Sequence, residues 1–164
     1  MRKAIAILTG LAVLAAANFT IYKRERQLAE GAVVILELAP VDPRSLMQGD
    51  FMALRFRVAD DAFGRTTVKE TGDGNLVVSV DDRRVGSFVR RDNGEALAQR
   101  EVRLRYRIRD ERVKFATNAF FFQEGQAKQF ERARYGEFRV APSGDLLLTT
   151  LRGEKLETLG TPKQ

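Results

Sequence analysis

Residues 49–56 read GDFMALRF and follow the run PVDP at 40–43, and the folded part of this chain is organised around them. The two prolines interrupt strand pairing and force turn or extended geometry on their neighbours. Gly49 and Asp50 then close the loop, and the side chains alternate from that point. The residues that share the more apolar face are Met52, Leu54, Phe56 and Val58, and those of the other face are Phe51, Ala53, Arg55 and Arg57. This pattern predicts a strand with one buried face.

Apolar and alternating runs elsewhere in the chain predict further short strands, separated by turns rich in Gly, Asp, Asn and Pro. The expected strands cover 32–38, 51–58, 76–80, 85–90, 101–108, 113–122, 137–141 and 145–151. The only helical pattern after the N-terminal segment is a weak apolar stripe within 126–134. We therefore expect a mainly β domain, an antiparallel barrel or sandwich of seven or eight short strands with one short helix.

Residues 4–22 form an apolar segment without a charged side chain. As a helix it spans about 28 Å, close to the thickness of a bilayer core. Ala15–Ala17 would fit the cleavage site of a signal peptide, but the apolar run continues past it and a charged, helix-favouring stretch leads on to Gly31. We expect an uncleaved single transmembrane helix within an anchor over 1–31, an extracytoplasmic domain over 32–160 and a loose tail over 161–164.

The composition excludes several classes of chemistry. The chain has no cysteine and no histidine, which removes thiol nucleophiles, disulfides, imidazole bases and the usual zinc ligands. The formal net charge is +6, but part of this excess flanks the apolar segment and the rest is interspersed with Asp and Glu. Nucleic-acid binding is therefore not expected, and no cofactor is expected.

Two motifs carry a family resemblance. The run APVDPR at 39–44, followed by the 49–56 motif with Leu54, resembles the GDYXXLXY family of bacterial membrane-anchored proteins, and FFQEGQA at 121–127 is similar to that family's second region. Both motif tyrosines are phenylalanine here, at Phe51 and Phe56, so the hydroxyls of those two motif positions cannot supply essential chemistry in this chain.

The resemblance implies an envelope protein of unknown biochemical activity with an N-terminal membrane anchor. It also implies a multi-spanning membrane protein as partner, because such a protein is often encoded beside members of the family. We accordingly expect a non-catalytic accessory or binding module in the bacterial inner membrane, single-pass, with its C-terminal domain in the periplasm.

Acidic residues near the motif are the first candidates for a site. Asp50 and Asp42 can accept hydrogen bonds from backbone N–H groups and fix the turn, and Arg44 could pair with either of them as a clamp. Glu124 could join the two aspartates around a hard cation only if the fold brought all three together. We predict no metal site.

Ser45 is the weak catalytic candidate, because the local sequence resembles the entry to the catalytic strand of serine–lysine signal peptidases. It lies only four residues before Gly49, too near for that arrangement, and Lys69 and Lys114 are bases only by default. A membrane-bound serine hydrolase related to those peptidases stays the alternative function, and we favour a chain that is not an enzyme.

Alternation in 101–109 places Arg103, Arg105, Arg107 and Arg109 on one outward face, about 6.8 Å apart along the strand. Together with Arg55 they are binding candidates, since such a stripe could meet anionic lipid headgroups or an acidic partner. The alternative, which we favour, is a solvated face whose arginines pair with nearby acids.

An aromatic cluster follows at Phe115 and 120–122. Alternation sends Phe121 to the face opposite Phe120 and Phe122, so one face must be covered by a helix or be exposed to a partner. We favour a role in the core, with the 126–134 helix as the cover.

Overall fold

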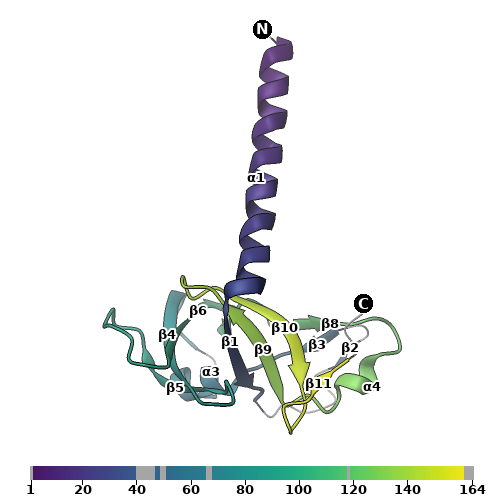
Figure 1. The fold of residues 1–164 in the computed structure, drawn as a ribbon. Coiled ribbons are helices and arrows are strands. Elements are labelled where there is room, and N and C mark those ends of the chain that lie inside the picture. The colour runs from purple at the N-terminus through teal and green to yellow at the C-terminus, as the bar shows by residue number, and fades with distance from the viewer. Residues whose placement is uncertain (1, 40–46, 49–50, 66–67, 118, 161–164) are drawn as a thin grey trace.

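The computed structural model describes residues 2–39, 47–48, 51–65, 68–117 and 119–160. A long helix, α1 (Arg2–Glu30), projects from one side of a β domain (Figure 1). Large apolar side chains along α1, among them Ile5, Leu14 and Ile21, are more than half exposed. The predicted N-terminal helix is thus present. None of the helices in the described ranges combines the length and apolar character that crossing a membrane demands, and the transmembrane assignment stays a prediction.

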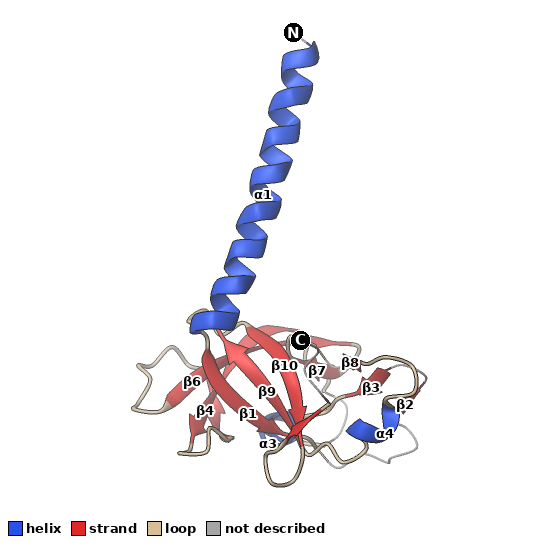
Figure 2. Ribbon diagram, turned by 45° about the vertical axis from the view of Figure 1, so that its right-hand side comes forward, coloured by secondary structure: helices blue, strands red, loops and turns tan. Residues whose placement is uncertain are grey.

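The strands form three antiparallel sheets that curl around a common core (Figures 1 and 2). The first sheet has the order β1 (Ala32–Glu37), β9 (Tyr135–Val140), β10 (Leu146–Arg152), β11 (Thr158–Leu159). The second has the order β5 (Gly86–Arg91), β4 (Gly72–Val80), β6 (Glu101–Arg109), β7 (Arg112–Lys114). The third has the order β2 (Met47–Gln48), β3 (Phe51–Ala53), β8 (Ala119–Phe121). The prediction of a mainly antiparallel β domain is confirmed.

One hydrophobic core joins the sheets, with Phe56 near its centre. The Phe56 ring meets those of Phe115 and Phe138 edge-on, at centroid distances of 5.7 and 5.3 Å. Met52, Leu54, Phe56 and Val58 are all buried, as the alternation predicted. The second aromatic of the motif is therefore a core residue, and its replacement by alanine would cost about 3–5 kcal/mol.

The strand expected over 51–58 is wrong beyond Ala53, because a short helix, α3 (Arg57–Phe63), takes over. The side chains of Val58, Ala59, Ala62 and Phe63 all pack on the core, at spacings that suit a helix face. Gly64 ends α3 with a φ of +81° and donates its N–H to the carbonyl of Asp60. Val58 is inward in both arrangements, which is why alternation mistook it for a strand residue.

The expected number of elements was also too low. The described residues contain eleven strands rather than seven or eight, because the run 113–122 splits into β7 and β8 and because β2 and β11 are two residues each, too short to show alternation. Within 126–134 only one turn, α4 (Ala127–Phe130), is helical. The domain therefore has two short helices in its described part, α3 and α4, where one was expected. The expected tail, 161–164, lies outside the described residues.

The aromatic cluster divides between core and surface. Phe115 is buried, and the rings of Phe120 and Phe122 pack against Phe130 of α4 at 5.0 and 5.5 Å. The expected helical cover is therefore present over one face. On the other face, Phe121 is 74% exposed and touches only the ring of Phe51 among the aromatic contacts of the described residues, at 5.9 Å.

Candidate functional site

The last turns of α1 are fixed to the β9–β10 hairpin by Gln27. This side chain is only 8% exposed, and its Nε2 donates hydrogen bonds to the carbonyls of Arg139 and Asp145 at 3.1 and 2.8 Å. Gly31 follows in a tight passage, where a Cβ would lie 2.4 Å from the Gln27 carbonyl oxygen. The direction in which α1 leaves the domain is therefore set by buried hydrogen bonds, which are costly to break.

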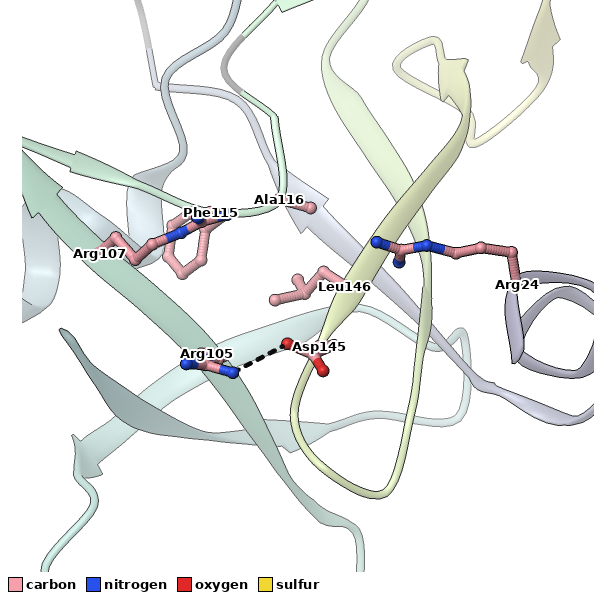
Figure 3. A pocket seen from close by; sticks show the side chains of 7 residues that line it. All are labelled: Arg24, Arg105, Arg107, Phe115, Ala116, Asp145 and Leu146. Carbon is pink, nitrogen blue, oxygen red and sulfur yellow. Dashed lines mark hydrogen bonds and ion pairs between the residues drawn. The ribbon is translucent and has the colours of Figure 1, made fainter. Parts of the chain in front are cut away.

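A cavity of about 260 Å³ lies beside this junction, between α1, β6 and the start of β10. Its lining residues are Arg24, Arg105, Arg107, Phe115, Ala116, Asp145 and Leu146 (Figure 3). A second cavity of about 250 Å³ shares Arg107, Phe115 and Ala116 with the first and adds Arg109, Lys114 and Thr117. We call the two together the basic groove.

Three elements contribute to the basic groove. β6 supplies arginines from its outward face, and the core residues Phe115 and Leu146 lie behind them. Arg24 reaches in from α1, on the side away from Arg107 in Figure 3. The groove is therefore lined mainly by cationic side chains.

Some of its cations are already paired with carboxylates. Arg105 lies 3.5 Å from Asp145, with a dashed line in Figure 3, and 3.9 Å from Asp73. Arg109 lies 2.8 Å from Asp73. The Lys114 ammonium donates to Asp110 at 2.6 Å and holds the pKa of that carboxyl below its ordinary value.

Arg24 and Arg107 differ from these. Neither guanidinium forms an ion pair with another residue in the described ranges, and Arg24 donates only to the side-chain oxygen of Gln27, at 3.1 Å. Two uncompensated positive charges therefore face the groove from opposite walls. Such an arrangement can bind an anion by charge-assisted hydrogen bonds.

The other predicted binding residues that the structure describes lie outside the groove. Arg103 donates to the Asp92 carboxylate at 2.9 Å and to the Glu95 carbonyl at 2.7 Å. Arg55 pairs with Asp60 of α3 at 2.8 Å. Glu124 is exposed in the turn before α4. The favoured interpretation of the arginine stripe, ion pairs with nearby acids, therefore describes Arg103, Arg105 and Arg109 but not Arg107.

The structure does not test the candidates near the motif, because Asp42, Arg44, Ser45 and Asp50 lie outside the described residues. The lysines proposed as bases for Ser45 can be placed. Lys69 is exposed, and Lys114 is held in its ion pair, so neither has the desolvated environment that turns a lysine into a base. In the part of the chain that can be searched, no group of three or more acidic side chains could hold a metal ion.

Sequence reasoning missed the α1 side of the groove. Arg24 was interpreted only as a charged flank of the apolar segment. The bonds of Gln27 join residues 112 and 118 positions apart in the chain, and no local pattern indicates them. The available signal was the turn at 142–144, which places Asp145 at the start of a strand.

A docked N-terminal helix, a curled antiparallel β domain and a basic groove at their junction define the class of architecture. The family model described as GDYXXLXY protein matches residues 13–151. The chain therefore belongs to the GDYXXLXY family, and every residue that lines the basic groove lies within the matched range. Neither the curated proteins nor the solved structures contain a match to it.

Proposed function

We propose that this chain is a non-catalytic accessory or binding module of the bacterial envelope, anchored by α1 as a single pass in the inner membrane. The β domain lies on the periplasmic side and acts with a multi-spanning membrane protein. The partner is the one that the family resemblance implies.

The observation that carries the proposal is the exposure of α1. Its exposed large apolar side chains are Ile5, Ile7, Leu8, Leu11, Val13, Leu14, Phe19, Ile21 and Tyr22. Each square ångström of apolar surface left in water costs about 25 cal/mol, and monomeric soluble proteins rarely expose a continuous apolar surface of this kind. Lipid around α1 would remove that cost. At the C-terminal end of α1, the hydrogen bonds of Gln27 hold the helix against the β domain.

The sequence of α1 also changes character where the β domain begins. The apolar run ends at Tyr22, and Lys23, Arg24 and Arg26 follow. The Lys23 ammonium lies 5.0 Å from the centre of the Phe19 ring. Basic side chains at the end of an apolar helix favour a position at the membrane–water interface.

A binding role suits the described surface. The basic groove presents guanidinium groups, which recognise anions by geometry and charge, and the exposed Phe121 offers an apolar contact for another protein. Neither feature requires a reaction. The motif position that a tyrosine would fill is occupied by Phe56, which is buried in the core.

Site-specific crosslinking tests the proposal, and the absence of cysteine makes it direct. A Phe121→Cys chain carrying a photo-crosslinker should remain in the membrane fraction and form an adduct with a multi-spanning membrane protein, identified by mass spectrometry. Val89→Cys, also at an exposed apolar position but on β5, is the matched control and should give no such adduct. A soluble chain, or a membrane chain that yields no adduct with a multi-spanning protein from either position, contradicts the proposal.

A further inference from the structure

The basic groove contains positive charges that have no ion-pair partner in the described part of the chain. Arg24 and Arg107 line the same cavity, and neither forms an ion pair with a described residue. Among the described residues, Asp145 is the one carboxylate that lines the cavity, and it lies near Arg105 and accepts a hydrogen bond from the Ser143 hydroxyl at 2.9 Å. Its negative charge is therefore already compensated, and the cavity favours an anion.

The groove also lies at a defined distance from the apolar part of α1. Arg24 comes two residues after Tyr22, so it lies only about 3 Å further along the helix axis. The polar headgroup layer on each side of a bilayer is about 5–8 Å thick. If α1 is anchored as proposed above, Arg24 and the cavity that it lines lie at the level of the lipid phosphates.

We propose that the basic groove binds the phosphodiester headgroup of an anionic lipid. Arg24 and Arg107 donate hydrogen bonds to the phosphate oxygens from opposite walls of the cavity. This inference rests on the proposed function, because the membrane position of α1 brings the lipid to the groove. A soluble phosphate would satisfy the same arginines, but the position of Arg24 next to the apolar part of α1 favours the lipid.

Native mass spectrometry of the full chain, purified in a non-ionic detergent with phosphatidylglycerol or phosphatidylcholine, measures the lipid directly. The wild-type chain should retain phosphatidylglycerol and little phosphatidylcholine. The double variant Arg24→Gln with Arg107→Gln should lose affinity for phosphatidylglycerol by about fivefold for each arginine removed.

The matched control is the double variant Arg83→Gln with Arg100→Gln. It removes the same charge from two exposed arginines that do not line the groove, and it should retain phosphatidylglycerol as the wild type does. Unchanged retention in the groove variant, or an equal loss in the control, overturns the inference. Displacement of phosphatidylglycerol by an equal concentration of inorganic phosphate assigns the groove to a soluble anion and overturns the lipid assignment.

Flotation separates this inference from the proposed function. The full chain should float with neutral phosphatidylcholine vesicles through α1 alone, and the groove variant should float equally well. A chain that does not float contradicts the membrane position and the inference with it. A chain that floats but shows no preference for phosphatidylglycerol contradicts the headgroup site alone.

Discussion

Arg103 and Arg107 lie on the same outward face of β6 and follow the same alternating pattern, but they differ in what their side chains bind. Arg103, in the first half, is 31% exposed and is held by Asp92 and by the carbonyl of Glu95. Arg107, in the second half, is exposed and forms no ion pair with a described residue. Arg103 lies against the segment that carries Asp92 and Glu95, whereas Arg107 lines the cavity beside α1. Neighbouring segments, and not the strand pattern, decide which arginines stabilise the fold and which can bind a ligand.

The inward face of β6 is common to both halves, and we expect the largest effect there. Leu104 is fully buried, so Leu104→Ala should lower the free energy of unfolding by about 2–5 kcal/mol through lost burial and a residual cavity. Chemical denaturation followed by circular dichroism measures this change. Val89→Ala, at an exposed position on the neighbouring β5, should change stability by less than about 0.5 kcal/mol. Equal effects of the two would show that β6 does not contribute to the core as described.

The next largest effect is a difference in stability between variants of two outward arginines, Arg103 and Arg107. Arg103→Gln breaks a partly buried charged hydrogen-bond pair and should cost about 1–2 kcal/mol. Arg107→Gln removes the same charge from the same face and should cost less than about 0.5 kcal/mol. The same denaturation experiment compares them. A similar loss from both would remove the distinction between Arg103 and Arg107.

The smallest effect concerns pH, at the start of β6. A hydrogen bond from Arg90 at 2.8 Å, and then one from the N–H of Ala98, lower the pKa of Glu101. A carboxyl whose pKa is lower in the folded state stabilises the fold above its unfolded pKa of about 4.3, and this stabilisation is lost as the pH falls through the lowered value. The Tm of the wild type should therefore exceed that of Glu101→Gln at neutral pH.

The gap in Tm should narrow on acidification below about pH 4. Glu124→Gln, at an exposed residue that forms no ion pair with a described residue, is the control for the loss of one carboxylate and should keep the Tm of the wild type at neutral pH. A gap between wild type and Glu101→Gln that stays constant with pH would contradict the role of the Arg90 pair.

Periodicity and turn residues in the sequence predicted several strands and one hairpin correctly. Alternation over 101–108 gave β6, and the turn signal at 142–144 gave the β9–β10 hairpin. Alternation over 51–58 also placed Phe56 in the core, although the strand β3 ends at Ala53. The helix α3 was missed because its buried residue Val58 fits a strand and a helix equally well. Short-range periodicity cannot separate the two over so few residues.

The basic groove depends on contacts that periodicity does not contain. Arg24 lines the same cavity as Arg107 because Gln27 fixes α1 against two carbonyls of a hairpin more than a hundred residues away. The arginine stripe was predicted as a unit, with ion pairs as the favoured interpretation. Asp92, Asp73 and Asp145 supply those pairs for three of its members. Arg107 was left over, and only the three-dimensional arrangement shows this.

The depth of α1 in a bilayer tests the central claim most directly. Nitroxides attached to the full chain at Leu14→Cys and at Leu28→Cys, both exposed positions, would be compared by electron paramagnetic resonance in reconstituted vesicles. If α1 spans the bilayer, the label at position 14 collides with oxygen and is shielded from a water-soluble nickel complex, and the label at position 28 shows the reverse. Equal access of the nickel complex to both labels would contradict the membrane position of α1.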